Sequence, residues 1–248
     1  MSLERIRFEQ SDFYNEHLDI EARKIARFLY NSSQYILERF LELMRWIKKY
    51  DGYQNILQRW LSYLIPKRKN ATQDLLDLEA HCYNFFKACQ NKEDFLKMRG
   101  LVPEKLFEII FDKRHQGKHC HKDYGVKVIV DNHPVLYRPK ESEQFECSND
   151  SNGPRQTVDG GFWDGKLGEF VEIKLQPEGF HTKEINYLKL LAETLKSKNL
   201  NHRIYFISLG NKEIIKNKLE RSGVSLTSEH EQFILIDKKD LLEMEEAS

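Results

Sequence analysis

The spacing of apolar side chains changes near residue 100, and this change restricts the folds that the chain can adopt. Up to that point apolar residues recur every three or four positions, which is the period of an α-helix with one buried face. Four stripes of this kind can be traced: Leu18, Ala22, Ile25, Ala26 and Leu29; Ile36, Phe40, Leu43, Met44 and Ile47; Leu57, Trp60, Leu61 and Leu64; and Leu75, Leu78, Cys82, Phe85 and Cys89. We therefore expect residues 1–100 to form an all-α region whose helices pack on one another.

Beyond residue 100 the pattern alternates between helix and strand. Pro103 suits the first turn of a helix whose apolar face holds Leu106, Phe107 and Ile110. Strands are expected at 126–130, 157–163, 167–175, 204–209 and 232–237, with helices from Thr182 to about Lys198 and at 211–221, and a polar loop at 141–155. This order predicts an α/β domain with a mixed sheet over residues 101–248.

Composition favours an ordinary globular protein. The chain has 39 basic and 39 acidic side chains and a formal net charge of zero, so a nucleic-acid partner would have to meet a local basic patch. The four cysteines form no CxxC pair, the first residues do not resemble a signal peptide, and no apolar run approaches the ~20 residues that span a bilayer. We expect a cytoplasmic, prokaryotic protein without a membrane partner.

Asp164-Gly165 lies between two strand-like runs, the pattern of a two-residue β-hairpin turn. With these residues at the centre of the turn, Trp163 lies opposite Lys166. Counting back along both strands then places Asp159 opposite Phe170, so that Asp159 shares a face with alternate residues of the second strand.

Those alternate residues include Glu172, Lys174 and Gln176, so the hairpin predicts two carboxylates and an ammonium group on one patch. Two carboxylates placed in this way can share a hard divalent cation such as Mg²⁺, for which Mn²⁺ can substitute. The ammonium group would orient a water or stabilise charge on a phosphate. A β-bulge at Gly160-Gly161 is the alternative that would change the register.

An acid followed two positions later by lysine occurs at Asp164-Gly165-Lys166, Glu172-Ile173-Lys174 and Asp237-Lys238-Lys239, so the tripeptide alone carries no information. Only the second combines an apolar alternation, a hairpin and an upstream Asp. Asp159 followed by Glu172-Ile173-Lys174 resembles the PD-(D/E)xK nuclease motif, with Val158 at the place of its proline. The resemblance covers residues of about 103–240 and implies a restriction-endonuclease-like fold.

The resemblance also implies roles for individual residues. Asp159 and Glu172 would hold Mg²⁺, and Lys174 would assist the attacking water. Members of the superfamily often carry a further acid on the helix before the first core strand, and here Glu108 is the better candidate, since Glu104 suits the helix start. An ordinary solvated helix acid is the alternative for Glu108.

Substrate contacts are expected from Gln176 and from the acid-free segment 113–122, through Lys113, Arg114, Lys118 and Lys122. A flexible polar loop is the plain alternative for this segment. Its residues His115, His119, Cys120 and His121 also permit a zinc site, although their spacing is crowded.

The expected function is a metal-dependent endonuclease that cuts DNA, in a restriction system or another form of host defence. The helical region would recognise DNA or mediate homodimerisation, because cutting both strands usually needs two sites. One alternative is a recombination or repair nuclease acting on branched or single-stranded DNA. A different class is a non-catalytic nucleic-acid-binding module that retains the fold.

Overall fold

The computed structural model describes residues 2–11, 15–47, 72–139, 154–224, 226 and 232–244. The chain divides into two compact units. Residues 1–12 and 115–241 form the first, which we call the sheet unit, and residues 13–114 and 242–248 form the second, the helical unit. The stripe predicted at residues 57–64 and most of the loop predicted at 141–155 lie outside the described residues.

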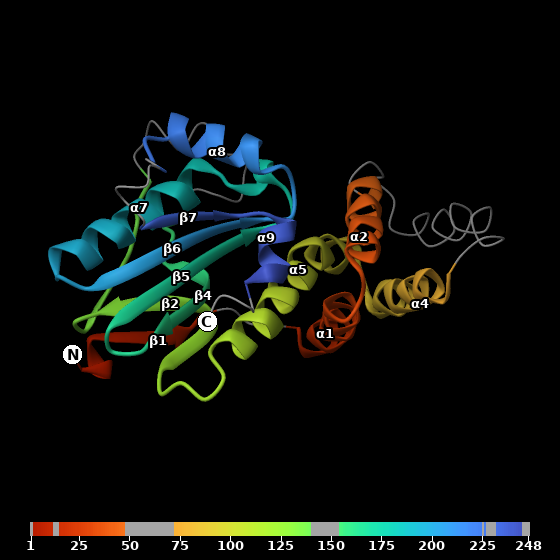
Figure 1. Ribbon diagram of the computed structural model, residues 1–248, viewed down its shortest axis with the longest axis horizontal. Helices are drawn as coiled ribbons and strands as arrows, with labels where there is room; N and C mark the ends of the chain where they lie inside the picture. Colours follow the sequence, from red (N-terminus) through yellow and green to blue (C-terminus); the bar gives the residue numbers. More distant parts are fainter. Residues whose placement is uncertain are drawn as a thin grey trace. The chain divides into compact units, whose positions relative to one another are not determined.

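The helical unit contains α1 (Glu16–Tyr30), α2 (Gln34–Ile47), α4 (Gln73–Ala88) and α5 (Lys92–Arg114) (Figure 1). Three of the predicted stripes fall on α1, α2 and α4, and their apolar members are largely buried. The N-terminal helical region is therefore confirmed.

Its predicted boundary at residue 100 is wrong. Helix α5 runs without interruption through Pro103, so this proline does not begin a helix, and the division between the units follows Arg114. A proline inside a helix removes one backbone hydrogen bond, but tertiary packing can compensate for that loss. Here Val102 and Phe107 are buried on either side of Pro103, and this packing holds the helix together.

The sheet unit contains one mixed sheet that, within the described residues, has seven strands. Its members are β1 (Ile6–Gln10), β2 (His121–Val130), β3 (His133–Pro134), β4 (Thr157–Trp163), β5 (Leu167–Lys174), β6 (Asn201–Ser208) and β7 (Phe233–Ile236). The order is β1-β2-β4-β5-β6-β7, with β3 paired to β2. Pairings from β1 to β5 are antiparallel, and β5, β6 and β7 are parallel. The predicted α/β fold with a mixed sheet is confirmed.

Strand β1 was not predicted, because it has only five residues, only Ile6 among them is buried, and its apolar alternation is limited to Ile6 and Phe8. Pairing with β2, from Ile6 opposite Val130 to Gln10 opposite Val126, makes it an edge strand. The first residues of the chain thus belong to the sheet unit and not to the helical region in which the sequence placed them.

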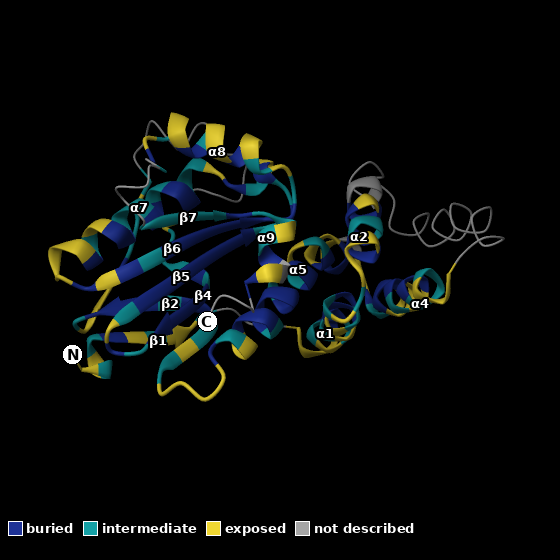
Figure 2. Ribbon diagram, in the orientation of Figure 1, coloured by how far each residue is buried: buried dark blue, intermediate teal, exposed yellow. Residues whose placement is uncertain are grey.

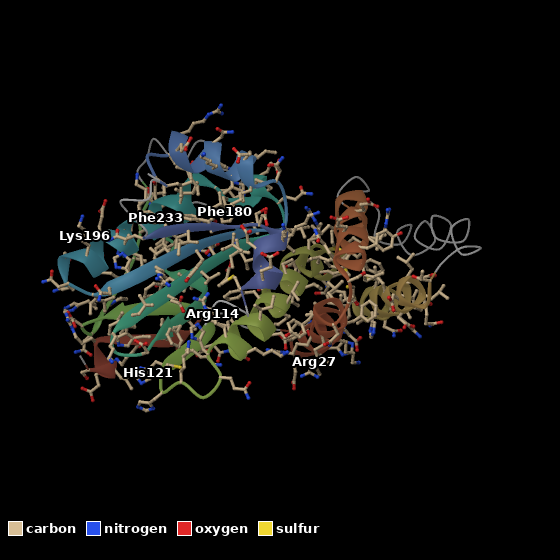
Figure 3. The ribbon with its side chains drawn as sticks, in the orientation of Figure 1. Arg27, Arg114, His121, Phe180, Lys196 and Phe233 are labelled. Atoms are coloured by element: carbon tan, nitrogen blue, oxygen red, sulfur yellow. The ribbon has the colours of Figure 1, made fainter. Side chains whose placement is uncertain are left out.

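Helices α7 (Thr182–Ser197) and α8 (Lys212–Arg221) supply apolar side chains to the core on one face of the sheet. Strands β4, β5 and β6 are almost wholly buried (Figure 2). Phe206 of β6 packs between Phe180 and Phe233, with ring centroids at 5.7 and 6.0 Å; the two outer rings are labelled in Figure 3. The short helices η1 (Leu3–Arg5), η3 (Pro177–Gly179) and α9 (Lys238–Glu243) complete the elements.

Candidate active site

The hairpin of β4 and β5 forms as predicted, but its turn is centred one residue later. Trp163 lies opposite Gly168, so Gly165 and Lys166 are the two central residues. Gly165 has a φ of 87°, which suits the first central position of a type II′ turn. The Asp164 carboxylate accepts hydrogen bonds from the Lys166 and Leu167 N–H groups at 2.8 and 2.7 Å, and these bonds fix the turn at this position.

The predicted pairing of Asp159 with Phe170 is therefore wrong, because Phe170 faces Gly161. The register is continuous through Gly160 and Gly161, so no bulge interrupts it. The slip of two residues preserves the alternation of faces, because side chains repeat with a period of two. Carried one pair beyond Gly160 and Val171, the same register brings Asp159 level with Glu172.

Beyond Gly160 and Val171, the Asp159 side chain replaces the backbone as the hydrogen-bond acceptor that joins β4 to β5. The Ile173 N–H donates to Asp159 Oδ2 at 2.7 Å, directly after the last paired residues, Gly160 and Val171. The Asp159 carboxylate is thereby anchored to the backbone of β5. Its position depends on strand geometry and not on a flexible loop.

The three predicted residues do come together. Lys174 Nζ lies 2.5 Å from Glu172 Oε1 and 3.4 Å from Asp159 Oδ2. The Glu172 side chain is fully buried, whereas the side chains of Asp159 and Lys174 remain 14% and 24% exposed. One cationic group thus already bridges both carboxylates, and the patch is open to solvent on the side of Asp159 and Lys174.

Arg155 is a fourth member of this cluster, and the sequence analysis missed it. Its Nη2 lies 2.8 and 2.9 Å from the two oxygens of Glu172 and 3.9 Å from Asp159 Oδ1. The residue was placed in the predicted loop at 141–155. Its position four residues before Asp159, at the entry to β4, was the one available signal.

The backbone around Arg155 is held from two sides. Arg155 and Tyr137 exchange two backbone hydrogen bonds, of 2.8 and 2.9 Å. The Tyr187 hydroxyl of α7 donates to the carbonyl oxygen of Gln156 at 3.1 Å, and Asn186 donates to the Tyr137 hydroxyl at 3.1 Å. These contacts tie the entry to β4 to helix α7.

The four charges perturb one another. Burial lowers the pKa of Lys174, but the charges of Asp159 and Glu172 outweigh burial and raise this pKa above its usual value. Burial raises the pKa of Glu172, but Arg155 and Lys174 outweigh it and hold this pKa below its usual value. The pKa of Asp159 is raised, first by burial and then by the charge of Glu172. At neutral pH Lys174 is a fixed cation and Glu172 a fixed anion.

The protein side chains at this site supply only some of the ligands that Mg²⁺ requires. Mg²⁺ is usually bound by one or two carboxylates, with waters and substrate phosphates completing the octahedron. Asp159 and Glu172 meet that requirement, since one cationic nitrogen already lies between them. Within the described residues no group of three or more His, Cys, Asp or Glu side chains is placed to hold a metal, so the protein alone offers no closed cage.

Glu108 belongs to the helical unit, whereas the other three predicted catalytic residues belong to the sheet unit. It is 3% exposed and pairs with Lys105 at 2.5 Å and with Arg23 at 2.7 Å. Asp19 joins the same network, 2.7 Å from Lys105. The alternative of a solvated helix acid is wrong, because Glu108 is buried and links helix α5 to α1.

The remaining predicted substrate residues are dispersed. Lys113 and Arg114 belong to the helical unit, where Lys113 Nζ contacts the Tyr30 hydroxyl. Lys118 and Lys122 are exposed in the sheet unit. Lys122 lies opposite Phe162, which in turn lies opposite Glu169, three residues along β5 from Glu172, so Lys122 projects from the other face of the sheet.

Gln176 is half-buried two residues after Lys174 and precedes η3. Its carbonyl oxygen accepts from the Gly179 N–H at 2.9 Å. A Cβ on Gly179 would lie 3.2 Å from the Lys174 Cβ, so this short helix packs against the lysine stem. The bend after β5 therefore buttresses Lys174.

The zinc alternative for segment 113–122 finds no support. His115 is buried, stacks on Phe162 at 3.8 Å and lies 2.8 Å from Glu169 Oε2, whereas His119 is exposed. His121 Nδ1 lies 3.3 Å from the Ile6 carbonyl oxygen. These histidines thus have separate surroundings.

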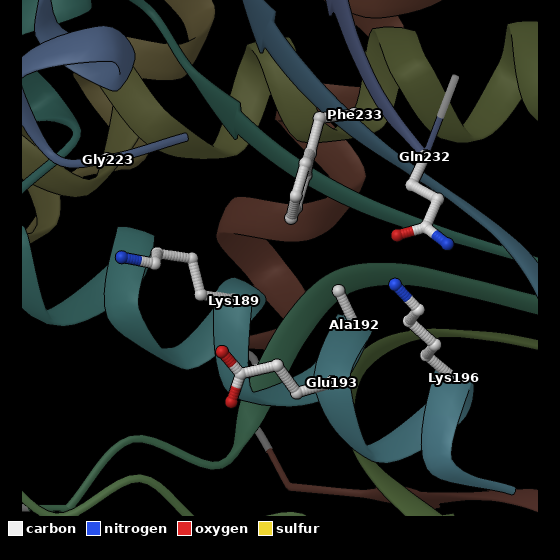
Figure 4. Close-up of a pocket in the computed structure, with 7 residues that line it drawn as sticks. All are labelled: Lys189, Ala192, Glu193, Lys196, Gly223, Gln232 and Phe233. Atoms are coloured by element: carbon white, nitrogen blue, oxygen red, sulfur yellow. The ribbon is translucent and has the colours of Figure 1, made fainter. Parts of the chain in front are cut away.

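A pocket between α7 and β7 is separate from the charged cluster (Figure 4). It is lined by Lys189, Ala192, Glu193, Lys196, Gly223, Gln232 and Phe233. Lys196 and Gln232 point toward one another across it (Figure 4). None of the four residues of the cluster lines this pocket.

The chain was compared with family models, curated proteins and solved structures. No family model matches the chain, and no curated protein matches it. One solved structure that it resembles is protein VC1899 from Vibrio cholerae, with 13% sequence identity and a TM-score of 0.45. That match covers 98% of this chain and 57% of the solved chain, so this chain spans little more than half of that protein. Among the described helices, none is long and apolar enough to cross a membrane.

Proposed function

We propose that this chain is a magnesium-dependent endonuclease of the PD-(D/E)xK class that hydrolyses DNA phosphodiester bonds. One observation carries the proposal: Asp159, Glu172 and Lys174 converge on a common point at the end of a rigid hairpin. Two carboxylates and an ammonium group within contact distance are the groups that metal-assisted phosphodiester hydrolysis needs. The mixed sheet flanked by helices is compatible with a restriction-endonuclease-like fold.

Asp159 and Glu172 would hold the metal ion, which when bound would polarise the phosphate and lower the pKa of a coordinated water. The charges of Asp159 and Glu172 raise the pKa of Lys174, so its side chain is an ammonium group in the metal-free site. It would orient the attacking water and stabilise negative charge on the phosphate oxygens. The apolar face of β5, through Val171 and Ile173, anchors the strand that carries two of these groups.

Wider roles rest on the same proposal. Restriction or another form of host defence in a prokaryotic cytoplasm is the expected setting, with a homodimer that cuts both strands. Lys118 would contact phosphates away from the reacting group, and Gln176 would contact substrate next to Lys174. Lys122 projects from the opposite face of the sheet and is not part of the proposed site. Glu108 has structural partners of its own, and a catalytic role for it requires evidence from activity.

The test compares wild-type protein with Lys174→Ala on supercoiled plasmid in the presence of Mg²⁺ or Mn²⁺. We expect wild type to nick the plasmid and Lys174→Ala to lose about 100-fold or more of the rate. The Tm of Lys174→Ala should fall, because Lys174 pairs with two largely buried carboxylates, so the rates are compared at a temperature at which circular dichroism shows both proteins folded. The matched control is Lys166→Ala, because Asp164-Gly165-Lys166 has the same spacing and Lys166 is exposed in the turn. Full activity in Lys174→Ala would remove this residue from the mechanism.

A non-catalytic module is the second candidate, and the charge balance of the site favours it. The two carboxylates of the cluster are already balanced by two cations without a metal ion. The carboxylates belong to Asp159 and Glu172, and the cations to Lys174 and Arg155. A wild-type protein that neither nicks plasmid nor melts at a higher temperature with added Mg²⁺ or Mn²⁺ would establish this candidate.

A further inference from the structure

Arg155 occupies the acceptor sites that a metal ion at Glu172 would need. A carboxylate offers about four lone-pair directions on its two oxygens. Arg155 Nη2 takes one on each oxygen of Glu172, at 2.8 and 2.9 Å, and Lys174 Nζ takes another on Oε1 at 2.5 Å. Only one direction, on Oε2, is left for a further ligand.

Steric and electrostatic arguments point the same way. Mg²⁺ binds carboxylate oxygen at ~2.1 Å, well inside the distance at which Arg155 now lies from the same oxygens. At so short a distance in a largely buried site, the two cations would repel each other strongly, because little water separates them. Arg155 is also held near Asp159, at 3.9 Å, so it opposes a divalent cation at both carboxylates.

Arg155 can leave Glu172 without losing all its partners. Its Nε donates to the Thr157 carbonyl oxygen at 3.1 Å, and its side chain is 21% exposed. Its Nη1 makes no hydrogen bond with a described residue, so that nitrogen remains available to an anion. A phosphate oxygen is the natural acceptor, because guanidinium groups bind phosphate through charge-assisted hydrogen bonds.

We propose that Arg155 is a built-in competitor of the divalent cation for Glu172, and that it holds the site in a metal-poor form until a phosphate draws the guanidinium away. This inference rests on the proposed function, since it needs a metal ion at Asp159 and Glu172. It makes Arg155 a positioning residue whose removal changes metal affinity directly, before any DNA is bound.

Binding of Mn²⁺ to the full chain without DNA tests the inference, with free Mn²⁺ followed by its electron paramagnetic resonance signal. We expect Arg155→Gln to bind Mn²⁺ at least about fivefold more tightly than wild type, the lower end of typical coupling between two sites. The gain should vanish in the double variant Arg155→Gln, Asp159→Asn. Arg7→Gln is the matched control, since Arg7 is exposed in the same unit and its side chain donates to Asn132 Oδ1, away from the cluster.

An unchanged or weaker affinity in Arg155→Gln, in a protein whose Mn²⁺ binding depends on Asp159, would overturn the inference and leave the proposed function intact. If neither protein binds Mn²⁺ in a manner that depends on Asp159, the proposed function fails and the inference falls with it. Should Arg155→Gln be unfolded at the assay temperature, Arg155→Met replaces it. Methionine keeps an apolar stem of similar length and removes the charge, so this variant too should bind Mn²⁺ more tightly.

Discussion

The Ile173 N–H donates to Oδ2 of Asp159 at 2.7 Å, so the carboxylate of one strand completes the backbone pairing of the next. This bond places the acid at the point where β4 and β5 cease to pair. It also fixes Asp159 beside Glu172 and Lys174 with little freedom of its own. The geometry of the cluster is therefore a property of the sheet, and variants of its members should report on both stability and chemistry.

Asp159→Asn should stabilise the protein at neutral pH while it removes metal binding. The pKa of Asp159 is raised above 3.8, by burial and by Glu172, so the ionised carboxylate costs stability in the folded state. Asparagine can still accept the Ile173 N–H. We expect a higher Tm than that of wild type at pH 7, measured by thermal melting.

The sign of the pH dependence follows from the same shift. Below the unfolded pKa of about 3.8 both states hold the proton, and no penalty exists. The penalty grows as pH rises toward the folded pKa and is complete above it, so the advantage of Asp159→Asn should disappear near pH 3. Asp123→Asn in β2 makes the same atomic change and should show no such gain. A lower Tm for Asp159→Asn at pH 7 would contradict the argument.

Tyr205→Phe should destabilise the sheet unit. The Tyr205 hydroxyl donates to Glu169 Oε1 at 2.5 Å, and both residues are nearly inaccessible to solvent. Without the hydroxyl a buried carboxylate loses a hydrogen bond, which costs about 1–3 kcal/mol. Urea unfolding measures the loss, and Tyr83→Phe on exposed helix α4 is the control. Equal unfolding free energies for the two variants would refute the importance of this bond.

Gly161→Ala should disturb the edge of the sheet. A Cβ at this position would lie 2.4 Å from Phe8 Cε1, so the Phe8 ring or strand β1 must move. Overpacking of this kind costs about 1–3 kcal/mol, and the second substitution Phe8→Ala should recover part of it. The control is Gly100→Ala, where the added Cβ meets only Glu104 Oε1 at 3.4 Å and helix propensity improves. Thermal melts that rank the two variants in the opposite order would exclude the clash.

Lys105→Met should destabilise the helical unit. Lys105 is 1% exposed and pairs with Asp19 at 2.7 Å and Glu108 at 2.5 Å. Its loss leaves Asp19 and Glu108 without the cation that joins them, although Arg23 still contacts both, and breaking a buried pair costs about 3–5 kcal/mol. Lys97→Met on the exposed face of the same helix should cost less than about 1 kcal/mol. Similar chemical denaturation of both variants would show that the network contributes little.

The sequence by itself determined the elements whose signal is local. Helical stripes identified α1, α2 and α4, and alternation around Asp164-Gly165 identified the hairpin of β4 and β5. Because strand faces repeat every two residues, even a turn centred one residue late left Asp159 on the side of Glu172 and Lys174. The candidate site was therefore accessible to sequence reasoning, because its three residues lie on one hairpin.

Tertiary structure alone decided what depends on partners distant in the chain. Strand β1 alternates over too few residues to be recognised alone, and it exists because β2 offers it free hydrogen-bonding groups. Helix α5 passes through Pro103 because packing offsets one lost backbone bond. Arg155 was missed, and the buried partners of Glu108 were not foreseen, for the same reason: a buried charge lies where an opposite charge compensates for its lost water, and only the folded chain shows where that opposite charge lies.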